Sequence, residues 1–376
     1  MIDRLARLLD YLEENIDSEH VKKVEELHCS VLNYCEVEYL PLSVIYPLDN
    51  EFEKFPYSEA YDDPEKMLYN ELLWSFSSTL NSVRLKDHFP LQIRSNHGIG
   101  IISSLFGAKC KIINDNMPWV EHFEDIKEIE KVIEKGMPQL GAGLGGKVLE
   151  THKYFMDTLR QYPKCYNAIH ITQPDLQGPF DIAHLLVGPQ IFYEVYDNPE
   201  IIHRLLELIT QTYIEYCKYL EPYLTDKAGK NAVYVHGSIY GGRVVIKDDT
   251  AAVNLSEEMY NEFSRQYNEK IFEAFDGGTL HHCGQERPWH FSSFYSQNLK
   301  GINYGNPEMH DLLKTYEYWS EKKVPIIWWG YNQKADFLKD VYDLKINTGI
   351  SAAAIADNLD EARNILQRHT ERRCVK

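Results

Sequence analysis

The sequence predicts a (β/α)8 barrel of the TIM-barrel type, an α/β fold, with an N-terminal helical extension. Short runs rich in β-branched and aromatic residues alternate with long helical stretches, as in βαβ units with a parallel sheet. Polar and glycine-rich loops follow several of these runs. The length of 376 residues suits one large barrel. We therefore expect residues 1–38 to form the extension and residues 39–376 to form a single barrel.

The elements follow in order along the chain. Residues 1 to about 28 have the pattern of an amphipathic helix that packs outside the barrel, with apolar side chains at Leu5, Leu8, Leu9, Leu12 and Ile16. The expected strands are residues 40–46, 91–94, 168–172, 232–235, 278–282, 301–304, 325–329 and 350–355. Helical patterns lie between them, at residues 200–219, 256–275, 309–322 and 360–368 among others.

Composition excludes several classes of protein. The formal charge of −18 opposes binding to nucleic acid, whose phosphates are held mainly by Lys and Arg. Apolar runs stay below the roughly 18 residues that cross a bilayer, and the first residues form a charged amphipathic segment in place of a signal peptide. The seven cysteines lack paired spacing, which argues against a disulfide framework. We expect a cytoplasmic protein without a membrane partner.

The pair His281-x-Cys283 at the end of a predicted strand is the sharpest chemical feature. Residues i and i+2 of a strand point to the same side, so the imidazole and the thiolate can reach one metal ion, and the pair suits zinc. The alternative is a buried polar strand end with an inert thiol. A zinc site would need at least one further ligand.

Four segments follow one another along the chain as a recognisable set. They are Gln173-Pro174-Asp175-Leu176-Gln177-Gly178-Pro179-Phe180, Tyr196-Asp197-Asn198-Pro199-Glu200, Asp248-Asp249 before Leu255-Ser256, and Leu280-His281-His282-Cys283-Gly284. In this order they resemble landmarks of the uroporphyrinogen decarboxylase superfamily. The similarity covers about residues 40 to 370 and is nearest to the branch of corrinoid-dependent methyltransferases.

The resemblance implies a barrel whose open end binds substrate. In the methyltransferase branch it also implies a zinc ion held by His281, Cys283 and a later cysteine, with a corrinoid carried on a partner protein. The later cysteine would fall near Ala354, where the sequence has no Cys or His. His236 or His97, at other strand ends, could replace it, or the metal could be absent.

The decarboxylase branch binds a polycarboxylate, and the resemblance would require arginines after the first strand. The segment 47–53 is acidic instead. Burying carboxylates without cationic partners is costly, so we expect no uroporphyrinogen decarboxylation.

Polar residues near the other predicted strand ends complete the expected site. His236, Asp248 and His97 are candidates for acid–base catalysis. The candidates for binding a small-molecule substrate are Asn96, Gln173, Asp175, Gln177 and Trp328. The glycine-rich stretch 141–146 follows a helical pattern instead of a strand, which argues against a phosphate loop.

Three hypotheses remain open at this point. The first is a methyltransferase that moves a methyl group between a small methylated compound or thiol and a corrinoid. The second is a metal-free decarboxylase or lyase of a small carboxylate. The third is a binding protein that kept the barrel and lost the chemistry, since a fold does not fix a function.

Overall fold

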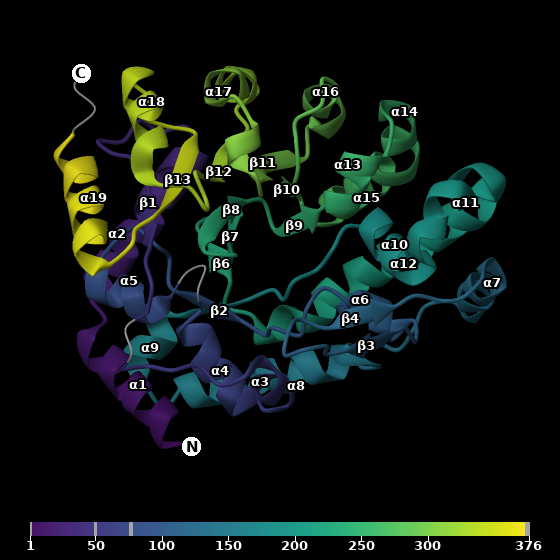
Figure 1. Cartoon of the computed structure of the whole chain (residues 1–376), viewed down its shortest axis with the longest axis horizontal. Coiled ribbons are helices and arrows are strands. Elements are labelled where there is room, and N and C mark those ends of the chain that lie inside the picture. Colours follow the sequence, from purple (N-terminus) through teal and green to yellow (C-terminus); the bar gives the residue numbers. More distant parts are fainter. Residues whose placement is uncertain (1, 49–50, 75–77, 373–376) are drawn as a thin grey trace.

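Eight parallel strands in the described part of the chain form a (β/α)8 barrel with an outer layer of helices (Figure 1). The computed structural model describes residues 2–48, 51–74 and 78–372. The barrel strands are β1 (Leu42–Ile45), β2 (Gln92–Arg94), β5 (His170–Thr172), β9 (Val244–Lys247), β10 (Gly278–His282), β11 (Leu299–Tyr304), β12 (Ile326–Trp329) and β13 (Ile350–Ile355).

Six of these strands share one parallel sheet in the order β1-β13-β12-β11-β10-β9, and β2 pairs with β5 separately. On one side of β1, the backbone amides donate to side chains and not to a neighbouring strand. The amide of Leu42 donates to His88 Nδ1 over 3.1 Å, and the amide of Val44 donates to the Asp87 carboxylate over 2.7 Å. Between β5 and β9, the amide of Gly178 donates to the carbonyl of Lys247 over 2.7 Å. The edges of both sheets therefore have polar partners at these points.

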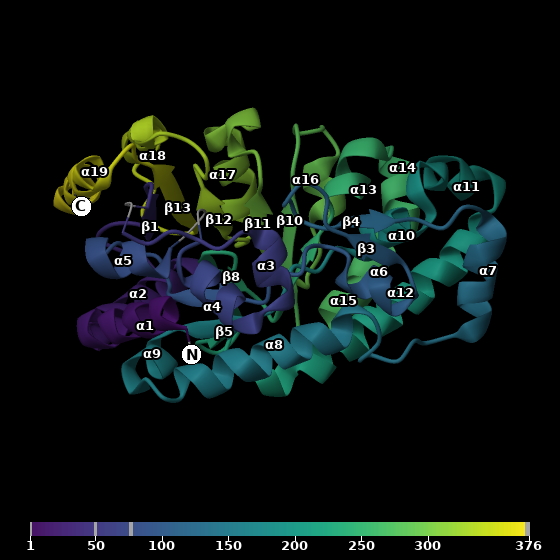
Figure 2. The same ribbon diagram turned by 60° about the horizontal axis from the view of Figure 1, so that its bottom comes forward.

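The helices lie outside the strands, and Figure 2 shows the long helices α8 and α12 along the lower side of the barrel. They are α1 (Asp3–Asn15), α2 (Ser18–Leu32), α3 (Tyr57–Asp62), α4 (Pro64–Leu72), α5 (Thr79–Leu85), α6 (Ile101–Leu105), α7 (Ile126–Lys135), α8 (Leu144–Leu159), α9 (Pro163–Ala168), α10 (Pro179–Val187), α11 (Ile191–Asp197), α12 (Pro199–Leu220), α13 (Asp249–Asn254), α14 (Glu257–Tyr260), α15 (Gln266–Ala274), α16 (His290–Phe294), α17 (Leu312–Glu321), α18 (Leu338–Asp343) and α19 (Leu359–Glu371). In the part of the chain that the structure describes, every helix is too short or too polar to cross a membrane.

The N-terminal extension forms two helices where the sequence suggests one. α1 ends at Asn15, and Asp17 caps α2 by accepting a hydrogen bond from the amide of His20 over 3.1 Å. The apolar face of α1 is buried, and the helix packs on α4, α5 and α9. The domain boundary at residue 38 stays a prediction.

Most predicted elements are confirmed, with one informative exception. Residues 232–235 form β7 (Ala232–Val235), which pairs antiparallel with β8 (Ser238–Gly241) and with β6 (Lys227–Ala228). The parallel strand beside β10 is β9 instead. The prediction of residues 232–235 as a barrel strand was therefore wrong, because a hairpin strand and a buried parallel strand share the same β-branched composition.

The hairpin β7–β8 fills the interior of the barrel. Val233, Val235 and Tyr240 pack with inward-facing residues of the wall, among them Val245 and Ile327. β8 contacts β10, β11 and β12, and Figure 1 shows the hairpin between these strands and β2. A second hairpin, β3 (Lys109–Lys111) with β4 (Trp119–Glu121), stands apart from the barrel sheet.

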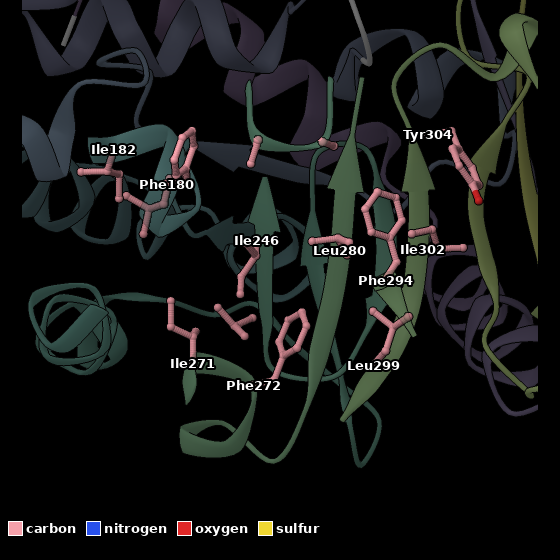
Figure 3. Close-up of a cluster of buried hydrophobic side chains, with 14 of the residues drawn as sticks. Phe180, Ile182, Ile246, Ile271, Phe272, Leu280, Phe294, Leu299, Ile302 and Tyr304 are labelled. Carbon is pink, nitrogen blue, oxygen red and sulfur yellow. The ribbon is translucent and has the colours of Figure 1, made fainter. Parts of the chain in front are cut away.

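The outer face of β9, β10 and β11 is apolar. Ile246, Leu280 and Ile302 are register partners on neighbouring strands and lie side by side in Figure 3. Ile271 and Phe272 of α15 are buried in the same cluster. This layer sets which residues of the three strands face outward.

Other details agree with the sequence. Of the seven cysteines, Cys374 lies outside the described residues and the other six are free thiols. The glycine-rich stretch packs against α6, since a Cβ on Gly143 would lie 2.6 Å from the carbonyl oxygen of Ser104.

Substitution of Gly241 tests how closely the hairpin fits the wall. A Cβ at this position would lie 1.9 Å from the carbonyl oxygen of Lys300. We expect Gly241→Ala to lower the free energy of unfolding by about 1–3 kcal/mol in urea denaturation. At the matched control Gly141, a Cβ would meet only the Tyr219 hydroxyl, at 3.6 Å. Equal stability of Gly241→Ala and the native chain would contradict the tight insertion of the hairpin.

Candidate functional site

The alternating direction of side chains along β9, β10 and β11 determines which residues form the inner wall of the site. Because Ile246, Leu280 and Ile302 face outward, the next residue of each strand faces the interior. These residues are Lys247, His281 and Asn303, and they are register partners across β9, β10 and β11. One polar row thus lies at the carboxyl ends of three adjacent strands, the end where barrel enzymes build their sites.

Asp249, His281 and Cys283 bring a carboxylate, an imidazole and a thiol together. His281 Nε2 lies 3.5 Å from Asp249 Oδ1 and 3.4 Å from Cys283 Sγ. The three donor atoms lie within 4.8 Å of one another, and each residue is half-buried. Oxygen, nitrogen and sulfur donors in this arrangement are those of a transition-metal site.

Asn303 selects the tautomer of the neutral His281 ring. The Asn303 amide nitrogen donates to the carbonyl of Ile327 over 2.6 Å, which leaves Oδ1 as the acceptor for His281 Nδ1–H. His281 Nε2 then carries a lone pair directed at the Asp249–Cys283 pair. This is the outer partner that orients a metal-binding histidine.

A backbone hydrogen bond links Cys283 to the carboxylate of Asp249. The amide of Cys283 donates to Asp249 Oδ1 over 2.8 Å. Burial, and then the carboxylate of Asp249, raises the pKa of the Cys283 thiol to about 12. In the metal-free protein the thiol therefore stays protonated at neutral pH.

A buried charge cluster occupies another wall of the same site. Asp175 accepts from Arg94 Nη1 over 3.1 Å and forms a short ion pair with Lys247 Nζ. The side chains of Arg94 and Lys247 are only 4% and 10% exposed. Burial opposes ionisation of Asp175, but Lys247 and Arg94 outweigh it and hold the pKa of its carboxyl well below the usual range.

His236 joins this cluster from the tip of the β7–β8 hairpin. Its backbone has φ = 45°, a left-handed turn that brings the ring to the two cations. Burial, followed by Arg94 and Lys247, holds the pKa of His236 well below its usual range. The neutral ring accepts at Nε2 from Arg94 Nη1 over 2.6 Å and from Lys247.

Both groups line one cavity of about 290 Å³. Arg94, Asp175, His236 and Lys247 line one part of it, and His281, Cys283 and Asn303 line another. The rest of the wall includes the aromatic side chains of Trp74, Tyr240, Tyr304, Trp328 and Tyr331. A polar small molecule with an apolar body matches this lining.

The structure divides the predicted site residues into two groups. His281, Cys283, His236, Asp175 and Trp328 line the cavity. Asp248, His97, Asn96, Gln173 and Gln177 lie outside its wall.

Asp248 and His97 are held in the packing around the barrel. Asp248 accepts from Ser264 over 2.8 Å and from Asn268 over 2.9 Å, and burial raises its pKa to about 6. Ser264 belongs to a π-helical turn, Asn261–Arg265, between α14 and α15. His97 Nε2 lies 3.1 Å from the hydroxyl of Thr151, and burial lowers its pKa to about 3.

Asn96, Gln173 and Gln177 follow the ends of β2 and β5. The Asn96 amide donates to buried Glu71 over 3.1 Å. Gln177 is buried and Gln173 is half-buried. Their roles in substrate binding stay predictions.

Sequence reasoning missed Arg94, Lys247, Asp249 and Asn303. Lys247 and Asn303 could have been found from the outward positions of Ile246 and Ile302, had Val244–Lys247 been recognised as a barrel strand. Asp249 follows the same strand, so its carboxylate reaches the end of β10. Ala354, where a third family ligand was sought, is buried in β13 opposite Val44. The third donor of the cluster is Asp249, the first residue of α13, which follows β9.

Comparisons with known proteins agree with the barrel fold. Residues 93–304 match the family model described as Uroporphyrinogen decarboxylase (URO-D). Among solved structures, a methyltransferase from Methanosarcina mazei superposes with a TM-score of 0.62 at 15% sequence identity, over 92% of this chain and 97% of that chain. This likeness shows the fold. A search of curated proteins finds no match.

The shared carboxylate of Asp175 can be tested by its removal. Asp175→Asn leaves the buried charges of Arg94 and Lys247 without this partner, so we expect the free energy of unfolding to fall by about 3–5 kcal/mol. The double variant Asp175→Asn/Lys247→Met should recover much of this loss. As a control, Glu19→Gln removes an exposed partner of Lys23 and should change stability by less than about 1 kcal/mol. If Asp175→Asn and Glu19→Gln lowered the free energy of unfolding equally, the structural role of the ion cluster would be contradicted.

Proposed function

The chain belongs to the uroporphyrinogen decarboxylase family, and on this premise we propose that it is a cytoplasmic methyltransferase. The methyl group would move between a small methylated substrate or thiol and a corrinoid carried on a partner protein. The observation that carries the proposal is the Asp249–His281–Cys283 donor set on the wall of the cavity.

The donor set fits zinc. Zinc is bound in proteins by imidazole nitrogen, thiolate sulfur and carboxylate oxygen, and catalytic sites use three protein ligands and keep one position open. His281, Cys283 and Asp249 would hold the ion beside the cavity. When bound, zinc supplies a Lewis acid that lowers the pKa of a thiol and so favours the nucleophilic thiolate.

The protein residues around this site have separate tasks in the proposal. Asn303 holds His281 in the tautomer that presents Nε2. Asp249 fixes the backbone at Cys283 through the amide hydrogen bond. The aromatic residues of the cavity keep water away from the reacting methyl group.

Uroporphyrinogen decarboxylation itself does not suit this cavity. A polycarboxylate would need several cations, whereas the described lining offers Arg94 and Lys247, which already share Asp175. The same two cations favour a second candidate, a metal-free decarboxylase of a small carboxylate. Loss of activity on metal removal separates the two candidates, because only the methyltransferase requires the ion.

Zinc content tests the donor set directly. We expect the purified protein to hold close to one zinc ion per chain by elemental mass spectrometry. Asp249→Asn, His281→Ala and Cys283→Ser should each weaken zinc binding by more than about 100-fold in chelator competition, since each removes a ligand.

Cys35→Ser is the matched control for the thiol, because Cys35 is an exposed cysteine remote in sequence from the site. It should retain full zinc content. Native-like thermal melts of the variants would show that the fold is intact. A zinc content at background level in the native chain would remove the metal from the proposal.

Methyl transfer itself is tested with methylcobalamin and 2-mercaptoethanol. The carbon–cobalt bond breaks and leaves its electron pair on the metal as cob(I)alamin, a carbon–sulfur bond forms, and the thiol proton is released. We expect the zinc-loaded protein to raise formation of the methyl thioether above the protein-free rate, as measured by mass spectrometry. His281→Ala should reduce this rate by more than about 100-fold.

A series of small methylated compounds tests the reverse direction in the same assay. Turnover in either direction supports the methyltransferase. Zinc-loaded, folded protein that fails in both directions would instead support a binding protein that has lost the chemistry.

A further inference from the structure

The charge cluster has more hydrogen-bond donors than acceptors. Arg94 and Lys247 share the carboxylate of Asp175, and His236 accepts from both cations as a neutral ring. The bonds of Arg94 to Asp175 and His236 both run from Nη1. Arg94 Nε and Trp328 Nε1 are buried and have no acceptor among the described residues.

A buried donor without an acceptor costs about 1–3 kcal/mol. Both of these donors belong to residues that line the cavity. The cluster therefore leaves two donors without an acceptor on residues of the cavity wall. The Nε edge of a guanidinium, with its two parallel N–H groups, matches a carboxylate in plane and spacing.

The charge balance of the cavity favours an anion once the triad holds a divalent ion. Arg94 and Lys247 are balanced by Asp175 and Asp249 in the metal-free protein. A divalent ion held with the Cys283 thiolate adds two positive charges and one negative charge, which leaves one positive charge uncompensated. Burial raises the pKa of nearby Glu71 to about 7, and Glu71 lies outside the cavity wall, so it is a weak source of compensation.

The walls beside the cations are flat and aromatic. The Arg94 guanidinium lies 4.5 Å from the centroid of the Trp74 ring. The rings of Trp328 and Tyr331 stack with centroids 4.9 Å apart and an interplanar angle of 16°. Such surfaces favour a planar apolar body over a branched or heavily hydrated one.

We propose that Arg94 and Lys247 bind the carboxylate of a small, flat, monoanionic substrate whose body lies along the aromatic wall. The far end of that substrate is then directed toward Cys283, and this second part rests on the proposed function. The carboxylate site itself stands on the charge cluster alone.

Benzoate and benzamide form a matched pair of probes, because they share size and planarity and differ in charge. Isothermal titration calorimetry with the full chain should show benzoate binding at least about 10-fold more tightly than benzamide. Arg94→Gln and Lys247→Met should each weaken benzoate by about 10-fold or more and change benzamide by less than about 2-fold. Arg363→Gln, an exposed change on α19, should leave both unchanged.

If a variant fails to fold, the affinities of the native chain for the two probes still test the proposal. Equal affinities of the native chain for benzoate and benzamide would overturn the proposal, and so would an absence of benzoate binding at millimolar concentration. Benzoate binding that disappears with a chelator and persists in Arg94→Gln would place the carboxylate on the metal, which also overturns it.

Chelator-treated protein separates this inference from the proposed function. It should still bind benzoate through Arg94, more weakly than the zinc-loaded protein because one positive charge is gone. Arg94-dependent binding together with a failed methyl-transfer assay would retain the carboxylate site and reject the methyltransferase. Normal methyl transfer together with equal affinities for benzoate and benzamide would retain the methyltransferase and reject the carboxylate site.

Discussion

Ile246, Leu280 and Ile302 pack outward from three neighbouring strands, and this packing determines the chemistry on the other side of the sheet. A strand has a period of two residues, so the apolar layer under the helices forces the following residue of each strand inward. A register slip of one residue would place Lys247 in the apolar layer under the helices and expose an isoleucine to the cavity. The hydrophobic layer thus holds the polar row in register.

The hairpin β7–β8 imposes the second constraint. It fills the barrel with Val233, Val235 and Tyr240, and the site cavity lies near the carboxyl ends of the strands. Its tip presents His236 to Arg94 and Lys247, and the two cations share Asp175. Desolvating three charged groups is costly unless each has close partners, so the hairpin, the cations and the carboxylate depend on one another.

The sequence predicts the barrel and the location of its site because both rest on local patterns. Seven of the eight expected strand runs are parallel barrel strands, and His281 and Cys283 do lie together at the end of β10. Residues 232–235 were wrongly predicted as a barrel strand, because a hairpin strand inside the barrel and a strand of the barrel wall have similar compositions. That error hid β9, and with it the adjacent Asp249 and Lys247.

The missing family ligand near Ala354 illustrates a second limit of sequence reasoning. A metal site is defined by where donor atoms meet, and β9 and β13 both border the interior of the barrel. A carboxylate at the end of one strand can therefore replace a thiolate on another, although more than one hundred residues separate Asp249 from Ala354 in sequence. A count along the chain leads to Ala354, whereas the register of β9 with β10 brings Asp249 close to His281 as the proposed substitute.

Lys247 links the two ends of the cavity. It pairs with Asp175, and the charge of Asp249 also acts on it, since that carboxylate counters the effect of burial on the Lys247 pKa. A divalent ion at the triad would engage the Asp249 charge and leave Lys247 with a larger share of its own charge uncompensated. An anion beside Lys247 would then bind more tightly, and by thermodynamic reciprocity the bound anion would strengthen the hold on the metal ion. A substrate with one carboxylate would thus favour the metal-loaded state, in which the proposed chemistry takes place.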